Sequence, residues 1–450
     1  MAGVKFSVFR GAVPRVSERQ LAARFARTAR NIKITSGNIE PLKGLAQSEL
    51  ILMDGPASIF RYRHAPLGVT PDENWLTFAD DTDLVNSPIA SDENSRIFWT
   101  ADVHDPRMST YDTAISGLGP YPAGFFMLGV PSPTDQPSAS ASGGTAPTTT
   151  RSYCYTYVTA LGEESGPSPS STVASGNNNG TWTVTGIQTA PTNSGTSSGW
   201  VTLPNGRIRA TLDTVFGMQI GSTLIMTYDT VELVDPLVET VRVLAVNAGS
   251  SYVEFARAAY PVGTTPTLAW ERASPINITG MVKRLYRTDG TASSFMYVTE
   301  LAIGDTSYAD SAAVSTGEPL QTAATVPPPG NLRCLIALPN GCLCGMTENE
   351  ICFSEPYIPY SWPVINRYSF VAKGVTIGAT GNSVIVLTDG YPVLATGSDP
   401  EAMTITVMET YAPCVSKRGS VNVGGGVLYP SHDGLWLAMA GAVELRTRAL

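Results

Sequence analysis

The sequence predicts an all-β, multidomain protein with one short helix near its N-terminus. The two halves of a small β-sandwich stand roughly a hundred residues apart, at 151–170 and 276–321. Turn-forming residues are abundant, with 42 Gly and 33 Pro among 450 residues, which favours many short strands. Near the C-terminus, turns recur at Asn349, Gly390 and Gly434, a spacing of 41 and 44 residues. This is the period of a four-stranded propeller blade.

The first element is a basic arm. Residues 1–43 carry nine basic and two acidic side chains, whereas the whole chain has a net charge of −9. Ser17 is placed to cap a helix over Glu18–Arg30, with Gln20 completing a capping box. A solvated helix face is one interpretation of the arm. The other is a contact with an acidic neighbouring subunit or adaptor through Arg15, Arg19, Arg24, Arg27 and Arg30.

An N-terminal β-module is expected to continue to residue 130. Residues 31–42 read as extended around a turn at 36–38, and strands are expected at 48–62, 75–79, 95–100 and 125–128. The following stretch, 131–150, is rich in Pro, Ser, Thr and Gly, which predicts a connector.

The split sandwich comes next. Tyr153, Tyr155 and Tyr157 share one face of a strand because strand side chains alternate. Residues 151–170 and 276–321 are too short to bury a core separately, so together they predict one fibronectin-III-like sandwich. Residues 171–275 are then an inserted β-domain, loop-rich over 175–202. Its strands are expected to form a small barrel or sandwich, at Arg207–Leu212, Thr223–Tyr228, Val238–Val246 and Tyr252–Ala256.

The last part of the chain is expected to hold propeller blades. Residues 322–330 contain three consecutive prolines and predict a stiff linker. Over 331–450, a strand–turn–strand unit occurs three times, at Leu332–Ser354, Val375–Thr396 and Val421–Met439. A closed propeller needs at least about four blades. Either the last blade comes from elsewhere, or this is an incomplete version of a longer chain.

No motif predicts catalytic, cofactor-binding or metal-binding residues, so the chain is not expected to be an enzyme and no cofactor is expected. Six cysteines form no C-x-x-C pair and three histidines lie away from them, unlike a zinc site; buried thiols in a reducing compartment are predicted. The N-terminus lacks the apolar core of a signal peptide and no apolar stretch is long enough to cross a membrane. Synthesis in a cytoplasm is therefore expected.

Three clusters favour structural roles. The acidic residues Asp80, Asp81 and Asp83 lack the later ligand of a calcium loop and are interpreted as a solvated loop. Residues 431–434 (SHDG) place Ser, His and Asp side by side, whereas a catalytic triad converges from distant positions, so a turn is predicted. Residues 353–362 (FSEPYIPYSW) resemble a sugar-stacking loop, but three nearby prolines favour packing.

Several phrases resemble one protein family. The opening FRGAVPRVSERQLAARFARTARNIKITSGNIEPL resembles the start of tail nozzle proteins, the tubular-protein-B type, of short-tailed bacteriophages. IFWTADVHDPRMSTYD, YPAGFFMLGVPSPT, YCYTYVTALGEESGPSPSS and ICFSEPYIPYSWP resemble later parts of the same proteins. Together these phrases cover about a third of the chain. The ending at Leu450 and the insertion at 171–275 depart from the family pattern.

The resemblance implies a virion protein with a β-platform and a propeller. Six copies would form a ring below the tail adaptor ring and prolong the DNA ejection channel. Its partners would be further copies of itself, the adaptor, tail fibres and genomic DNA that passes without specific binding. The alternative is a receptor- or carbohydrate-binding tail fibre or spike, although no short β-helix rung is present in the sequence.

Charge separates a conduit from a nucleic-acid binder. Residues 44–450 have a net charge of −16, and an acidic wall keeps a duplex mobile where a basic wall would grip its phosphates. Acidic side chains are therefore expected to dominate the lumen wall of the ring, and the arginines of the arm to lie at a subunit or adaptor contact.

Overall fold

The chain forms two compact units, Met1–Leu52 and Met53–Leu450. The computed structural model describes residues 54–64, 72–229, 237–256, 267–290, 294–315 and 317–449, together with separate positions between 17 and 41. In the first unit, β1 (Ile32–Lys33) pairs with β2 (Glu40–Pro41) in antiparallel register. This pairing agrees with the extended segment predicted for 31–42.

The helix predicted over Glu18–Arg30 is wrong at its described positions. Arg19–Ala22 and Phe25–Thr28 contain turns and bends. Ser17 and Gln20 instead close a turn, in which the Gln20 N–H donates to the Ser17 carbonyl at 2.9 Å and the Ser17 hydroxyl donates to Gln20 Oε1 at 3.3 Å. A helix of this length is marginal in water on capping and propensity alone. The one α-helix among the described residues is α1 (Tyr111–Ala114), capped by Thr110.

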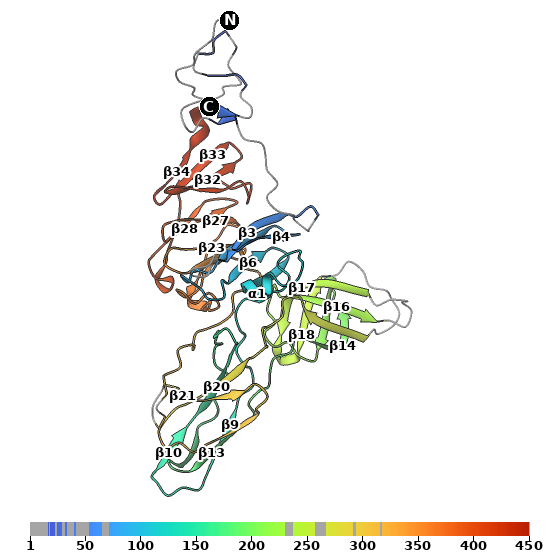
Figure 1. Ribbon diagram of the computed structural model, residues 1–450, viewed down its shortest axis with the longest axis vertical. Coiled ribbons are helices and arrows are strands. Elements are labelled where there is room, and N and C mark those ends of the chain that lie inside the picture. Colours follow the sequence, from blue (N-terminus) through green and yellow to red (C-terminus); the bar gives the residue numbers. More distant parts are fainter. Residues whose placement is uncertain are drawn as a thin grey trace. The chain divides into compact units, whose positions relative to one another are not determined.

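Four four-stranded antiparallel sheets form the main body of the second unit (Figure 1). In each sheet the strands follow one another in chain order, as in a propeller blade. Their strands are β5 (Thr82–Asn86), β6 (Ile97–Ala101), β7 (His104–Ser109) and β8 (Phe126–Met127); β23 (Arg333–Ala337), β24 (Leu343–Met346), β25 (Glu350–Phe353) and β26 (Arg367–Ser369); β27 (Gly374–Thr380), β28 (Ser383–Thr388), β29 (Val393–Thr396) and β30 (Thr404–Val407); β31 (Val421–Val423), β32 (Gly426–Ser431), β33 (Gly434–Met439) and β34 (Ala442–Leu445).

The last three sheets confirm the repeated strand–turn–strand units, and each gains a fourth strand that the sequence did not reveal. The first sheet, β5–β8, comes from the N-terminal module yet packs onto the sheet β23–β26. Phe98 and Met108 share a buried apolar cluster with Leu332 and Leu343. The row of sheets therefore begins more than two hundred residues before the C-terminal repeats.

Alternating side chains join successive sheets. On β28, Val384 and Val386 enter the cluster shared with the sheet β23–β26, whereas Ile385 and Leu387 enter the cluster shared with β31–β34. Because consecutive strand residues point to opposite faces, the sheet β27–β30 is buried on both sides. Its continuous run of apolar residues is the sequence signature of that position.

A hairpin covers the other face of the first sheet. It consists of β3 (Ser58–His64) and β4 (Asp72–Phe78). Tyr62 and Leu76 pack with Ile97 and Trp99 in one buried cluster, which also includes Ala114 of α1.

The sandwich contains the predicted strand pairing. β11 (Tyr153–Val158) pairs with β20 (Val282–Arg287), which pairs with β21 (Met296–Ala302). The opposing sheet contains β9 (Ser138–Ser142), β13 (Thr181–Thr185) and β22 (Ser307–Asp310), and a pair joins β10 (Thr148–Arg151) to β12 (Ala174–Asn177).

Two boundaries therefore need correction. The 131–150 connector contains β9 and β10. The inserted domain predicted over 171–275 begins later than expected, because β12 and β13 belong to the sandwich and the barrel starts at β14. Ala139 and Ala141 pack against the buried cluster around Trp182, so small side chains fill one face of β9 while serines occupy the other. A Ser/Ala alternation looks like a linker in composition although it has strand periodicity.

A row of serines covers the edge of β11. The Oγ atoms of Ser165, Ser168 and Ser171 accept hydrogen bonds from the backbone N–H groups of Tyr157, Tyr155 and Tyr153, at 2.9, 3.2 and 3.0 Å. The N–H groups of the same serines donate to the carbonyls of the same tyrosines at 2.8 to 2.9 Å. The serine segment thus provides hydrogen-bond partners for backbone N–H and carbonyl groups along the edge of β11, which would otherwise be unpaired.

The inserted domain is a closed six-stranded barrel. Its strands are β14 (Ser194–Thr202), β15 (Arg207–Leu212), β16 (Thr223–Asp229), β17 (Leu237–Asn247), β18 (Tyr252–Ala256) and β19 (Thr267–Arg272). At its base the Asn193 side chain holds the chain entering the barrel to the chain leaving it: Oδ1 accepts from the Ile276 N–H at 2.8 Å, and Nδ2 donates to the Ile276 carbonyl at 3.0 Å.

In the proline-rich segment 322–330, residues 325–330 are buried or half-buried, whereas Ala323 and Ala324 are exposed. The Gln219 side-chain amide donates to the Pro328 carbonyl at 2.6 Å, and Gly221 lies against Gly330. Gly221 has a φ of +93°, and an added Cβ there would meet the backbone of Gly330 at 2.4 Å. Only glycine fits this crossing. All six cysteines are free and buried, which confirms the prediction of buried thiols.

Candidate functional site

The predicted arginine contact lies mostly outside the described residues. Arg19 and Arg27 are described and exposed, whereas Arg15, Arg24 and Arg30 are not among the described positions. The two described arginines belong to the separate N-terminal unit. The proposed adaptor or subunit contact therefore stays a prediction.

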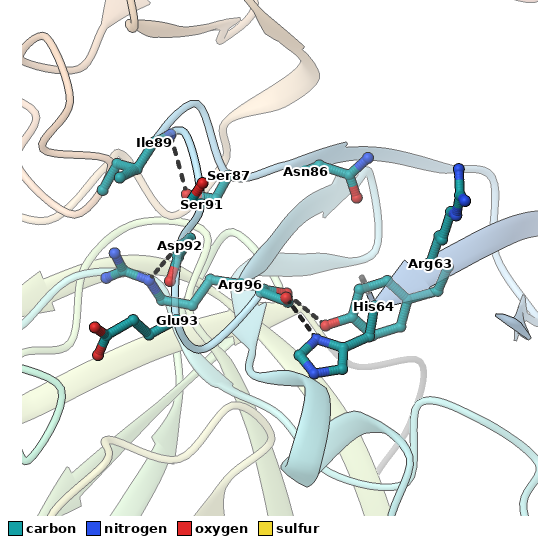
Figure 2. A pocket seen from close by; sticks show the side chains of 11 residues that line it. Arg63, His64, Asn86, Ser87, Ile89, Ser91, Asp92, Glu93 and Arg96 are labelled. Carbon is teal, nitrogen blue, oxygen red and sulfur yellow. Dashed lines mark hydrogen bonds and ion pairs between the residues drawn. The ribbon is translucent and has the colours of Figure 1, made fainter. Parts of the chain in front are cut away.

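A hollow of about 600 Å³ opens beside the first sheet and the hairpin β3–β4. Figure 2 shows its lining, which comes from the end of β3 and from the loop between β5 and β6. Most of the lining residues have polar side chains, and Ile89 is the aliphatic residue among them: Tyr62, Arg63, His64, Asn86, Ser87, Ile89, Ser91, Asp92, Glu93, Ser95 and Arg96.

The buried polar groups of this lining bind one another. Arg96 Nε lies 2.8 Å from the Asp92 carboxylate and Nη1 lies 3.1 Å from the Glu163 carboxylate. The His64 imidazole stacks on Tyr111 with ring centroids 4.2 Å apart, and its Nδ1 lies 2.7 Å from Ser95 Oγ. Two carboxylates already neutralise Arg96, so its charge is not available to bind a ligand in the hollow.

The Arg96–Glu163 pair also connects the loop between β5 and β6 to the turn after β11. Both side chains are at least nine-tenths buried. Burial raises the pKa of the Glu163 carboxyl, and Arg96 acts in the opposite direction. Removing either partner would leave a buried charge uncompensated.

A buried group of Ser274, Asp105 and His104 contains the residue types of a hydrolase triad but not its geometry. The Ser274 hydroxyl donates to the Asp105 carboxylate at 2.8 Å and accepts from Arg107 Nε at 2.8 Å. His104 Nδ1 lies 2.8 Å from the carbonyl of Asp105. A nucleophilic serine needs a base at its hydroxyl, and here a carboxylate and a guanidinium occupy that place. The arrangement joins the end of β19 to β7.

Residues 431–434 form the tight turn predicted for them. Ser431 pairs with Gly434 across β32 and β33, and Trp436 Nε1 donates to the Asp433 carboxylate at 2.8 Å. The loop 353–362 was predicted to have a packing role, and its Trp362 is indeed buried. Trp362 Nε1 donates to the Pro359 carbonyl at 2.9 Å.

The acidic cluster after β4 is not simply a solvated loop. Arg418 Nη1 and Lys417 Nζ each lie 2.8 Å from the carboxylate of Asp83, and Asp81 pairs with the same two cations. The solvated interpretation is wrong for Asp83, whose side chain is 13% exposed. Its partners lie more than 330 positions away in the sequence, so no local pattern could reveal them. Within the described ranges, no group of three or more His, Cys, Asp and Glu residues could hold a metal ion.

The last sheet presents an apolar face away from its neighbour. Val427, Tyr429 and Ala438 enter the cluster shared with β27–β30. Side chains of the opposite parity face the other way, and three of them are markedly exposed: Val421 at 52%, Val423 at 41% and Leu435 at 41%. Leu428 and Leu437 share this face and are partly exposed. We call these five residues the outward face of β31–β34.

One exposed aromatic pair was not singled out from the sequence. Tyr391, in the turn after β28, and Tyr411, in the loop after β30, meet edge to face with ring centroids 5.3 Å apart. Both are exposed. In the sequence the two tyrosines stand beside turn residues twenty positions apart, and their contact appears only once the chain is folded.

No known protein-family profile matches the chain, and no curated protein is significantly similar to it. Among the residues that the structure describes, no helix is long and apolar enough to cross a membrane.

Proposed function

We propose that the chain is a structural subunit of a phage tail, of the nozzle type that prolongs the DNA ejection channel below the adaptor. The observation that carries this proposal is the outward face of β31–β34, a row of aliphatic side chains on a sheet whose opposite face packs on β27–β30 through Val427, Tyr429 and Ala438. Exposed apolar surface of this kind marks protein–protein contact. The local resemblance to tail nozzle proteins implies that this contact lies between neighbouring copies in a closed ring of six within the virion.

The polar groups support a role without chemistry. Arg96 in the hollow is neutralised by two carboxylates. The Ser274 hydroxyl is held between Asp105 and Arg107. We therefore propose a protein that is not an enzyme and that works through shape and assembly.

Charge supports passage of DNA rather than its capture. Residues 44–450 have a net charge of −16, which repels phosphates at short range. In the proposed ring, acidic side chains of this part face the lumen, and the basic arm contacts the adaptor or a neighbouring copy.

Assembly on the adaptor tests the proposal. Purified protein is mixed with the tail adaptor ring and imaged by electron microscopy, comparing wild type with Leu435→Asp. The proposal expects rings from the wild type and their loss in the variant, because a charge on the outward face opposes its burial. Val371→Asp is the matched control, since Val371 is 95% exposed in a loop away from this face. Absence of the wild-type protein from tail rings would refute the proposal.

A carbohydrate-binding tail fibre or spike is the second candidate, and the exposed Tyr391–Tyr411 pair favours it. Aromatic side chains with free faces stack on sugars. Titration with host surface polysaccharide, followed by tyrosine fluorescence, distinguishes the two. Saturable binding that Tyr411→Ala abolishes would support the fibre, whereas no binding agrees with the nozzle.

A further inference from the structure

The row of four sheets has two kinds of contact. Buried apolar clusters join β5–β8 to β23–β26, β23–β26 to β27–β30, and β27–β30 to β31–β34. In the part of the chain that the structure describes, no such cluster joins the last sheet to the first. The contacts described between the loop that precedes β31 and the start of β5 are ion pairs and one hydrogen bond from a charged donor to the Thr82 carbonyl.

The ionic contact is dense. Arg418 donates from Nη1 to the Asp83 carboxylate at 2.8 Å and from Nη2 to the Thr82 carbonyl at 2.9 Å, and its guanidinium also pairs with Asp81. Lys417 Nζ lies 2.8 Å from Asp83 and 3.6 Å from Asp81. Each cation thus meets both carboxylates.

Burial distinguishes this contact from an ordinary surface pair. The side chains of Lys417 and Asp83 are each 13% exposed, whereas those of Arg418 and Asp81 are half exposed. Exposed pairs contribute little to stability, but networks with partly buried members contribute more. The half-exposed Arg418–Asp81 pair therefore meets solvent and salt before the more deeply buried Lys417–Asp83 pair does.

In the described part of the chain, the other hydrogen bonds of this loop lie on the side of its own sheets. The Cys414 N–H donates to the Thr388 carbonyl at 2.8 Å, and the Val415 N–H donates to the Pro430 carbonyl at 3.2 Å. Beyond these anchors, Ser416–Ser420 is stabilised by its own turn, in which the Gly419 N–H donates to Ser416 Oγ at 3.2 Å. Lys417 and Arg418 are therefore the residues that connect this loop to the first sheet.

We propose that Lys417 and Arg418 form an ionic latch that closes the row of sheets onto β5, and that salt opens this latch while the three apolar contacts stay closed. Salt screens charges within a few ångströms at molar concentration, but it does not weaken apolar burial. Among the described residues, the latch is thus a junction between sheets that has no buried apolar cluster beside its charges, so ionic strength sets its opening.

Hydrogen exchange of the whole protein measures the latch directly. Amides of residues 416–423 and of 383–396 are compared at 50 mM and 1 M NaCl, at one pH and temperature. We expect exchange in 416–423 to accelerate about fivefold to tenfold at high salt, with 383–396 unchanged. Equal exchange of 416–423 at both salt concentrations would overturn the proposal.

Charge variants test the residues. Asp81→Asn with Asp83→Asn should accelerate exchange of 416–423 at 50 mM NaCl and remove its salt dependence. Lys417→Asp with Asp83→Lys restores an opposite-charge pair and should recover part of the protection. Lys373→Gln is the matched control, because the Lys373–Glu348 pair at 3.0 Å is exposed on both sides and should leave 416–423 unaffected. If Lys373→Gln accelerates 416–423 as much as the aspartate variant does, the effect is general and the latch is rejected.

Discussion

The Tyr153 hydroxyl donates a hydrogen bond to the Asp310 carboxylate at 2.9 Å, and this contact joins the two sheets of the sandwich. The same carboxylate pairs with Arg151 and Arg287, whose side chains have no exposed surface. Arg151 also donates to the carbonyls of Ala312 and Ala313 at 2.9 and 3.0 Å. Asp289 pairs with the same two arginines, at 2.9 Å from Arg287 Nε and 3.7 Å from Arg151 Nε. Two carboxylates therefore balance two buried guanidinium groups.

Replacing the Asp310 carboxylate is expected to be severe. Asp310→Ala leaves two buried guanidinium groups short of a counter-charge, which costs about 3–5 kcal/mol. Urea unfolding monitored by tryptophan fluorescence measures the loss, because the Arg151 guanidinium lies over the ring of Trp182, 4.7 Å from its centroid. Glu444→Gln, in an exposed pair with Arg446, is the control and should change stability by less than about 0.5 kcal/mol. A small effect of Asp310→Ala would mean that the arginines find other partners.

The buried carboxyl of Asp105 gives stability a pH dependence. Burial raises its pKa to about 6, although Ser274 and Arg107 act to lower it. A carboxyl with a raised folded-state pKa binds its proton more tightly in the folded protein, so stability falls as pH rises from about 4 to about 6. Asp105→Asn should flatten this part of the profile, by on the order of 2–3 kcal/mol. Unfolding free energies at pH 4, 5, 6 and 7 measure it, with Asp102→Asn, at a half-exposed side chain, as the control.

The thiols should resist labelling in the native state. Burial raises the pKa of Cys154, Cys334 and Cys352 to about 12 and that of Cys342 to about 11. Thiolate is the reactive form, and it is scarce at pH 8. Titration with a chromogenic disulfide reagent should detect almost no free thiol in native protein and six per chain in denaturant. Rapid labelling of native protein would show that part of the core opens readily.

The serine row beside β11 should contribute additively. Each of Ser165→Ala, Ser168→Ala and Ser171→Ala removes an acceptor for a buried tyrosine N–H. The expected loss is about 1–2 kcal/mol for each, with faster hydrogen exchange of the paired amide. Ser170→Ala is the matched control, because Ser170 lies in the same segment, is exposed and binds no tyrosine amide through its hydroxyl. Unchanged exchange at Tyr155 in Ser168→Ala would contradict the role of the row.

The contact between the first two sheets rests on Phe98. This side chain is fully buried among residues of both sheets, so Phe98→Ala should cost about 3–5 kcal/mol. Hydrogen exchange should accelerate in Leu343–Met346 as well as in β6. Val103→Ala, at an exposed position two residues after β6, should have little effect. Acceleration confined to β6 would show that the first sheet is not held by this contact.

Much of the fold was predictable because the alternation of buried and exposed residues that marks a strand lies within the strand's own sequence. The bounds of β15 and β18 match the predicted Arg207–Leu212 and Tyr252–Ala256. In β15, buried residues alternate regularly with half-buried ones. The pairing of β11 with β20 was also predictable, since neither half of the sandwich has enough strands alone.

Other features depend on contacts that are remote in sequence. Nothing local in Thr82–Met127 shows that this segment packs against β23, nor that Asp83 is paired with Lys417. The β9 strand was missed because its inward side chains are alanines, which do not stand out as a core. The helix at Glu18–Arg30 was predicted from the capping residues Ser17 and Gln20, and a capping signal alone does not stabilise a helix of this length in water. The hydroxyl row at Ser165, Ser168 and Ser171 had a visible spacing of three, but that spacing belongs to no regular element.

The way Asn193 binds Ile276 has a consequence for how this chain can change over generations. The point where the backbone leaves the sandwich and the point where it returns are fastened by one side chain, so a few residues suffice to bridge them. Deleting or exchanging the stretch between them at the level of the gene leaves the strand order of the sandwich intact. We therefore expect kindred chains to differ most in the barrel, in length and in sequence, except where Gln219 and Gly221 contact residues 328–330.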